Sequence, residues 1–178
     1  MKIINSNLED IDEIYRLYDI AIEYQKERFH LHWPVFKRSL IETEINENRQ
    51  WKIMKDNNVA CVFAITFEDP HIWEEKNIDK AIYIHRIAVN PDYRGENFVN
   101  KIVKWAKIYA KSMGKDYLRL DTVGDNKKLL EHYRKNGFNF LGMVMLKNSK
   151  DLPRHYHNVP VSLFEMKLNN LSENFSRN

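Results

Sequence analysis

The segment from residue 81 to residue 122 constrains the fold most, because it has the pattern of a strand, a helix and a second strand. Ala81–Val89 is rich in β-branched residues and ends at Asn90-Pro91-Asp92, as a buried strand followed by a turn does. Apolar residues at helical spacing predict a helix over 98–113, and residues 117–122 predict another strand. Strands joined through a helix form a parallel pair by a right-handed crossover. The chain is therefore predicted to be a mixed α/β protein with a central parallel pair.

The flanking segments predict antiparallel strands and three more helices. Strands are expected over 2–5, 51–55, 59–68, 138–146 and 159–168. Helices are expected from a capping box at Ser6 to about Arg28, from Pro34 with Val35, Leu40, Ile41 and Ile45 on its buried face, and over 126–135. No linker or repeat interrupts the chain, so residues 1–168 are predicted to form one domain and residues 169–178 a frayed tail.

Composition excludes several classes of protein. Of the 178 residues, 43% are hydrophobic and 30% are charged, which is typical of a globular domain. No apolar run approaches the roughly 20 residues that a membrane helix needs, so no membrane partner is expected. Cys61 is the single cysteine, which excludes intramolecular disulfides and cysteine-based zinc clusters. A cytoplasmic protein is expected.

Charge is unevenly distributed along the chain. Residues 1–48 carry six Lys and Arg against ten Asp and Glu, whereas residues 80–135 carry thirteen against six. An acidic wall is suited to a cationic substrate and a basic groove to a polyanion, although both runs are also typical of solvated helix faces. The lysines of the 98–113 helix raise the alternative of a nucleic-acid-binding module. This alternative is disfavoured because the aromatic residues of that helix lie at core spacing.

Three separated sequence features resemble one known family. They are Ile-His-Arg-Ile-Ala-Val-Asn-Pro-Asp-Tyr-Arg-Gly (84–95), Leu-Arg-Leu-Asp-Thr-Val-Gly-Asp-Asn (118–126), and Tyr133 followed by Gly137-Phe138. Together they resemble the acetyl-coenzyme A region of the GNAT superfamily of N-acetyltransferases. The resemblance implies a mostly antiparallel sheet of six to seven strands whose central parallel pair splays apart, flanked by about four helices. It also implies an acyltransferase that uses acetyl-coenzyme A and needs no metal, in a family whose members often form homodimers.

The resemblance assigns a set of coenzyme-binding residues. Backbone groups of the strand residues Ile87, Ala88 and Val89 would hold the pantetheine arm. Amides of the loop would hold the pyrophosphate, and the loop residues are Arg94, Gly95, Glu96, Asn97, Phe98 and Val99. The side chains of Asn126 and Tyr133 would contact the acyl end. The loop departs from the family pattern, because Asn97 and Val99 replace its two later glycines. An alternative is therefore a divergent member that uses another acyl-coenzyme A or binds it without catalysis.

Acyl transfer to an amine needs a base and an acid. An alkyl ammonium has a pKa near 10.4, so a base must remove its proton before attack. Asp121 stands where some family members carry a carboxylate, and His85 has the pKa of a base at neutral pH; the two rank about level. The family gives Tyr133 the role of general acid toward the leaving thiolate.

The amine acceptor is expected to be a small molecule or a peptide, with no nucleic acid as partner. Its binding residues are expected among aromatic side chains and one carboxylate, namely Phe29, Trp33, Tyr83, Tyr156 and Glu68. Trp73 is a further aromatic candidate. The pairs His30/His32 and His155/His157 have metal-ligand spacing but no clear third ligand, so no metal site is predicted there.

Overall fold

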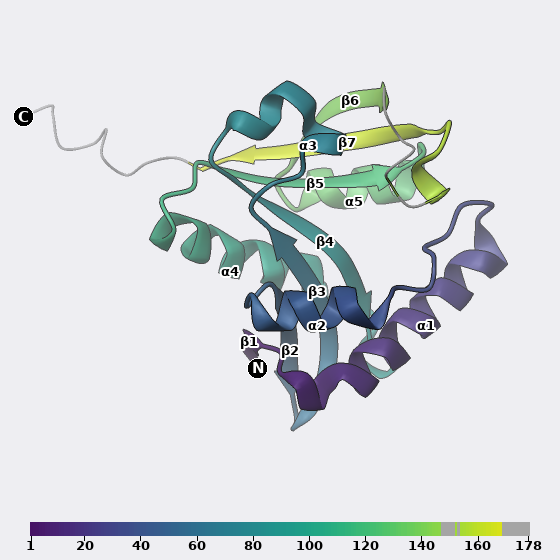
Figure 1. The fold of residues 1–178 in the computed structure, drawn as a ribbon, viewed down its shortest axis with the longest axis vertical. Helices are drawn as coiled ribbons and strands as arrows, with labels where there is room; N and C mark the ends of the chain where they lie inside the picture. The colour runs from purple at the N-terminus through teal and green to yellow at the C-terminus, as the bar shows by residue number, and fades with distance from the viewer. Residues whose placement is uncertain (147–151, 153, 169–178) are drawn as a thin grey trace, which may run out of the picture.

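A computed structural model describes residues 1–146, 152 and 154–168. Its seven strands form one sheet in the order β1-β2-β3-β4-β5-β7-β6 (Figure 1). The strands are β1 (Lys2–Asn5), β2 (Gln50–Lys55), β3 (Asn58–Thr66), β4 (Ala81–Val89), β5 (Tyr117–Val123), β6 (Asn139–Met145) and β7 (Pro160–Lys167). The pair β4/β5 is parallel and every other neighbouring pair is antiparallel. The predicted fold class is confirmed, and the predicted tail over 169–178 lies outside the described residues.

Five α-helices cover the two faces of the sheet. They are α1 (Ile11–Arg28), α2 (Arg38–Asn46), α3 (Pro70–Trp73), α4 (Phe98–Ser112) and α5 (Lys127–Lys135). Helices α4 and α5 pack with the even-numbered residues Ile82, Ile84, Leu118 and Leu120 into one core cluster. Helices α1 and α2 pack on the opposite face, and α3 covers the odd-numbered Ala81 and Tyr83 on that same face. Within the described residues, none of these helices is long and apolar enough to cross a membrane.

The parallel pair separates after three residues. β4 and β5 pair only through Ala81–Tyr83 and Tyr117–Arg119, although both strands continue past that point. Beyond Tyr83 the backbone of β4 has no strand partner on its β5 side within the described chain, and Figure 1 shows the two strands diverging. Unpaired backbone groups need other partners, so this edge is suited to bind an extended ligand.

A bulge in β4 changes which residues face each side of the sheet. Val62 and Ala64 of β3 pair with Ala88 and His85, so β4 has one extra residue in this interval. Arg86 takes a left-handed conformation there, with φ of 49°. After the bulge the alternation is inverted, and Ala88 packs with α1 and α2. His85 is the last residue before this inversion and stays on the face of Tyr83.

Two predicted helix boundaries are wrong. The first helical segment is capped by Asn7, whose side chain accepts from Glu9 N at 3.0 Å, whereas Ser6 is bonded through its backbone to β2. The second helix begins at Arg38 rather than Pro34. The residues from Leu31 to Lys37 form no regular secondary structure, and among them Trp33 and Phe36 pack against Tyr18, with ring centroids 6.2 and 5.2 Å away. Of the face expected to be buried, Val35 is 72% exposed and Leu40 38%, while Ile41 and Ile45 are buried.

Candidate active site

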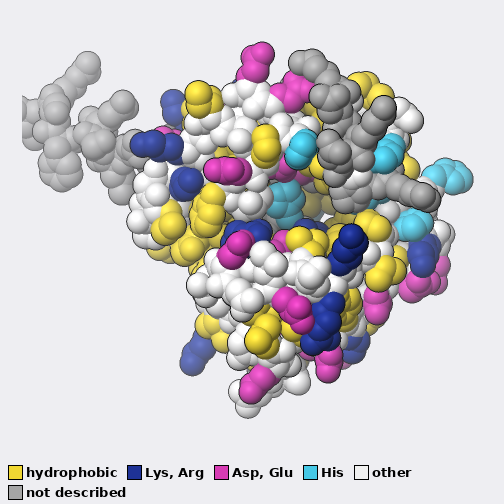
Figure 2. All heavy atoms as spheres, in the orientation of Figure 1, with side chains coloured by type: hydrophobic (Ala, Val, Ile, Leu, Met, Phe, Trp, Pro, Cys, Tyr) yellow, Lys and Arg dark blue, Asp and Glu magenta, His cyan; other side chains and the backbone are white. Residues whose placement is uncertain are grey.

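A cavity of about 830 Å³ occupies the opening between β4 and β5. Its walls come from the ends of both strands and from both faces of the sheet: α5 contributes Leu129 and Tyr133, whereas the α1–α2 connection and the turn before β7 contribute His32, Trp33 and Tyr156. Figure 2 shows histidine side chains gathered around a hollow on the α1–α2 face. Because the cavity is lined from both faces, two reactants can reach one point from opposite sides.

The loop that precedes α4 accommodates its unusual residues. Asn97 adopts the left-handed conformation, with φ of 50° and ψ of 53°, which asparagine tolerates better than most residues. Val99 lies in the first turn of α4 and packs against the core beneath it. Glu96 forms ion pairs with Lys55 and with Lys101, the latter at 3.2 Å, and the Lys55 contact lowers the pKa of its carboxyl group. The loop therefore keeps a left-handed turn, and cations accompany the charge of Glu96.

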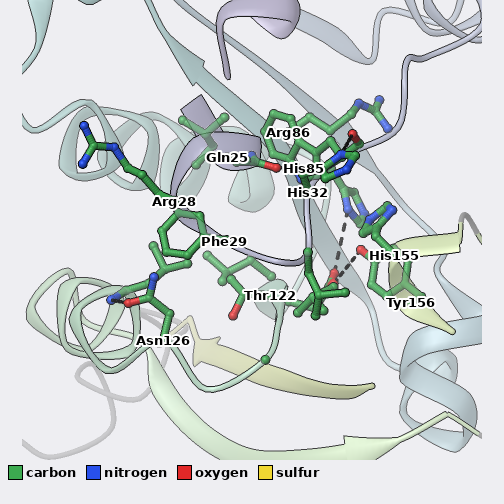
Figure 3. A pocket seen from close by; sticks show the side chains of 18 of the residues that line it. Gln25, Arg28, Phe29, His32, His85, Arg86, Thr122, Asn126, His155 and Tyr156 are labelled. Carbon is green, nitrogen blue, oxygen red and sulfur yellow. Dashed lines mark hydrogen bonds and ion pairs between the residues drawn. The ribbon is translucent and has the colours of Figure 1, made fainter. Parts of the chain in front are cut away.

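The other residues assigned to the coenzyme fall into two groups. Ile87, Asn126 and Tyr133 line the cavity, whereas Ala88 is buried toward α1 and α2. Asn126 caps α5, because its Oδ1 accepts from Leu129 N at 3.2 Å. Arg94, Gly95 and the rest of the loop through Val99 lie outside the lining of this cavity. In Figure 3, Asn126 lies beside Phe29 at one end of the cavity, away from His85 and Tyr156.

His85 and Asp121 face each other across the opening. Tyr83 pairs with Arg119, so the next residues on the same face are His85 of β4 and Asp121 of β5. His85 Nδ1 lies 3.9 Å from Asp121 Oδ1, and Tyr156 OH donates to Asp121 Oδ2 at 2.8 Å (Figure 3). Asp69, which follows β3, brings its Oδ2 to 3.5 Å from His85 Nε2. Sequence analysis did not single out Asp69, although an Asp before a Pro at a helix start is a recognisable cap pattern.

Burial shifts the pKa values of this cluster strongly. Desolvation raises the pKa of Asp121 to about 6, although the Tyr156 hydrogen bond opposes the shift. Desolvation, assisted by the charge of Asp121, raises the pKa of Asp69 to about 8. The pKa of His85 falls to about 3 because the ring is buried and lies near Arg86 and Arg49. At neutral pH, Asp121 is therefore mostly ionised, and His85 is neutral.

Tyr133 reaches the cavity from the opposite face of the sheet. Its ring packs against Phe164 and Phe138, with centroids 5.2 and 6.2 Å away. Burial, followed by the charge of Asp121, raises the pKa of the Tyr133 hydroxyl above its usual value. The phenol thus stays protonated at neutral pH and is available as a hydrogen-bond donor.

Some of the expected acceptor-binding residues line the cavity, and others lie outside it. Phe29, Trp33 and Tyr156 line the cavity. Glu68 is exposed and lies outside the lining. Tyr83 is fully buried beneath Trp73, and its hydroxyl accepts from Arg119 at 3.2 Å, so neither aromatic ring reaches the cavity. Tyr83 lies on the same face of the sheet as His85, but it precedes the point at which β4 and β5 separate.

An ion-pair network missed by sequence analysis borders the cavity. Arg86 of the bulge pairs with Glu44 of α2, which is 3% exposed, and Arg49 lies 3.6 Å from the same carboxylate. Arg86 also lies 5.2 Å from the centre of the Phe36 ring. Buried charges need such partners. The network therefore attaches the bulge to α2 and holds a guanidinium beside His85.

Asp69, His85 and Asp121 also deserve comparison with metal sites. Their potential ligand atoms lie within 4.8 Å of one another. However, the two carboxylates approach opposite nitrogens of the His85 ring. A single ion binds only one nitrogen of an imidazole, so this arrangement fits shared protons better than shared metal coordination.

A sheet that opens between two parallel strands agrees with the resemblance of the sequence to acetyl-coenzyme A-dependent transferases. The Acetyltransferase (GNAT) family model matches residues 9–138, so the chain belongs to this family of N-acetyltransferases. An uncharacterised N-acetyltransferase of Bacillus subtilis, YesJ, is 25% identical over 142 residues, covering 75% of this chain and 79% of that protein.

Solved structures show the same fold. A GNAT-family acetyltransferase from Listeria monocytogenes superposes with a TM-score of 0.75, at 23% identity and 94% coverage of both chains. The putative acetyltransferase yncA from Salmonella typhimurium, solved with acetyl-coenzyme A, gives a TM-score of 0.67 at 11% identity, covering 96% of this chain and 95% of that one.

Proposed function

We propose that the protein transfers an acetyl group from acetyl-coenzyme A to a primary amine by direct attack in a ternary complex. The observation that carries the proposal is the cavity between the splayed strands, with Tyr133 on one side and Asp121 with His85 on the other. Acetyl-coenzyme A supplies an activated thioester. The amine acceptor, a small molecule or a peptide, enters from the α1–α2 face past Phe29, Trp33 and Tyr156.

Features of the chain fit acetyl-coenzyme A. The β4 edge beyond Tyr83 has no strand partner toward β5 within the described chain, and it offers backbone groups to an amide-containing arm. Helix α4 begins after Asn97, whose side chain makes no capping hydrogen bond, and the amides of a helix N-terminus bind phosphate. Asn97 keeps the left-handed conformation there, and Val99 is directed into the core. These features favour a functional coenzyme site over a loop that has lost it.

The residues divide the chemistry between them. Asp121, a carboxylate with a pKa raised to about 6, takes the proton from the acceptor ammonium, so that the nitrogen lone pair is free to attack the thioester carbonyl. Backbone N–H groups of β4 beyond Tyr83, where the described chain supplies no strand partner toward β5, donate to the developing oxyanion. Tyr133 donates its hydroxyl hydrogen to the leaving sulfur as the C–S bond breaks, and its oxygen takes the second proton of the attacking nitrogen as the amide forms, which restores the phenol.

Calorimetric titration with acetyl-coenzyme A, with desulfo-coenzyme A and ATP as controls, tests the first half of the proposal. Micromolar binding that ATP does not reproduce is expected. No binding would contradict the coenzyme site. Binding without release of coenzyme A across a panel of primary amines would instead support the alternative of a member that binds without catalysis.

Tyr133→Phe tests the second half. We expect kcat for coenzyme A release to fall about 10- to 100-fold, while the affinity for acetyl-coenzyme A stays the same, because only the donor to the leaving sulfur is lost. Tyr109→Phe is the matched control, since Tyr109 stacks on Trp105 outside the lining of the cavity. Unchanged turnover in Tyr133→Phe would remove Tyr133 from the acid role.

A further inference from the structure

Asp69 lies behind His85 as seen from the cavity. His85 and Asp121 line the cavity, whereas Asp69 does not. The Asp69 side chain is 11% exposed, and its Oδ2 is buried without a hydrogen-bond partner in the described part of the chain. A buried carboxyl oxygen without a partner is costly, so its proximity to a ring nitrogen calls for an explanation. In this cluster Oδ2 lies 3.5 Å from His85 Nε2, and a backbone hydrogen bond from Ile72 to the carboxyl group opposes the rise of its pKa.

We propose that Asp69 is a positioning residue that donates a proton in a hydrogen bond to His85 Nε2 and thereby directs the Nδ1–H of the ring at the Asp121 carboxylate. The inference deepens the proposed function and rests on it. The His85 ring has two nitrogens with one acidic side chain at each, at 3.5 and 3.9 Å. These distances are longer than normal hydrogen bonds, and contacts in an unliganded site commonly shorten in the reactive complex.

The charges around the His85 ring support a proton on Asp69 and a proton on His85 Nδ1. Burial and the Asp121 charge raise the pKa of Asp69 to about 8, so its carboxyl group is mostly protonated at neutral pH and can donate. The ring is neutral because burial and two guanidinium groups lower its pKa to about 3. The charged and titratable groups near the cluster come from several elements: Arg49, Arg86, Asp69, Asp121, Tyr83 and Tyr156.

The tautomer matters because Asp121 is the proposed base. With the proton on Nδ1, the ring donates toward Oδ1 while Tyr156 donates to Oδ2, and the carboxylate is fixed from both sides. With the proton on Nε2, a lone pair of Nδ1 would face the same anion. In the transfer step the N–H bond of the ammonium breaks and an O–H bond forms on Asp121. Asp69 and His85 keep their protons throughout.

Asp69→Asn separates donation to Nε2 from ionisation of the side chain, because the asparagine amide donates to Nε2 as a protonated carboxyl does but never ionises. Nitrogen-15 NMR of histidine-labelled, ligand-free protein reads the tautomer directly, with His85→Gln assigning the signals. We expect Nδ1–H in the wild type at pH 6.5 and a switch to Nε2–H as the pH rises through about 8. Asp69→Asn is expected to keep Nδ1–H over the whole range, and Glu68→Gln, the exposed neighbouring carboxyl group, to behave as the wild type.

Activity gives the second measurement. The wild type is expected to lose kcat above a pH of about 8, and Asp69→Asn to keep neutral-pH kcat within about threefold while losing that high-pH decline. Asp69→Leu, which has no donor, is expected to lose at least about tenfold in kcat with little change in the affinity for acetyl-coenzyme A.

Several results would overturn the proposal. They are Nε2–H or a charged ring in the wild type at pH 6.5, a large loss of neutral-pH activity in Asp69→Asn, or stoichiometric Zn²⁺ binding that shifts the His85 nitrogens and is required for turnover. The NMR measurement needs no substrate and no variant that must fold beyond the assignment control. A correct tautomer without acetyl transfer would therefore contradict the proposed function and leave the hydrogen-bond assignment standing.

Discussion

Two buried polar clusters lie two residues apart on the same face of β4 and β5, and they differ in how well their groups are paired. At the closed end of the strands, Arg119 is 0% exposed and donates from Nε to Glu165 at 2.8 Å, from Nη1 to the Lys76 carbonyl at 2.6 Å, and from Nη2 to Asp79. At the open end, the distances from His85 to Asp69 and Asp121 are 3.5 and 3.9 Å.

The difference shows where the fold is stabilised and where chemistry is possible. Around Arg119, two carboxylates and a carbonyl compensate one guanidinium, and Trp73 and Tyr117 lie 4.7 and 5.0 Å from it. The Arg119 guanidinium, whose pKa is raised, keeps its proton at neutral pH, so this cluster is not suited to proton transfer. Around His85, burial leaves two carboxyl groups with raised pKa values and one imidazole with a lowered one. Such groups are characteristic of active sites.

Asp121→Asn should separate the two clusters most clearly. Removing the proposed base is expected to lower kcat/KM about 10²- to 10⁴-fold, while the protein stays folded. The measurement is release of coenzyme A with an accepted amine, alongside thermal unfolding. Asp125→Asn is the matched control, because Asp125 also lines the cavity but is exposed, and its kcat/KM should stay within about threefold of wild type. Equal activity in the Asp121 variant and the wild type would disprove the assignment of the base.

Arg119→Met should give the opposite result, a loss of stability. It leaves Asp79 and Glu165 without their buried partner, and we expect the free energy of unfolding in urea to fall by about 3–5 kcal/mol. Arg16→Met is the control, because Arg16 pairs with Glu13 at the surface with its side chain 47% exposed, and a change below about 1 kcal/mol is expected. A stable Arg119→Met protein would show that the closed end is not what holds the strands together.

Local patterns in the sequence predict the cluster around His85 in part and the cluster around Arg119 hardly at all. The period of two along a strand places His85 and Asp121 on one face, and the family resemblance places both strands in parallel. Tyr83 shares that face, but the sequence does not show where the strands separate, so it was expected in the cavity. Asp69 directly follows the strand predicted over 59–68, and no local pattern predicts its approach to His85, which depends on how α3 folds over β4.

Long-range packing also explains the errors in helix boundaries. Pro34 is suited to the first turn of a helix, yet Trp33 and Phe36 lie in a segment without regular secondary structure, where both contact Tyr18 of α1. Likewise, Arg86 follows the alternation of a strand in sequence, and only pairing with β3 shows that it lies in a bulge beside Glu44. Propensity and periodicity predict elements well, but contacts between distant elements decide their ends.

The smallest predicted effect is a pH dependence of stability at the open end. Burial raises the pKa of Asp121 from 3.8 to about 6, so in this window the native state holds a proton that the unfolded state has lost. Stability from this group is therefore lost as the pH rises from about 4 to about 6. Relative to wild type, Asp121→Asn should gain about 1–3 kcal/mol of unfolding free energy between pH 4 and pH 7.

Urea unfolding at several pH values measures this difference, with Asp125→Asn as the control variant at an exposed carboxyl group. Taking the difference between variant and wild type removes most of the opposing effect of His85, whose lowered pKa destabilises the native state below about pH 6.5. A difference that is independent of pH would mean that Asp121 is solvated as an ordinary surface carboxylate. In that case, its burial at the open end would not have prepared it to accept a proton near neutral pH.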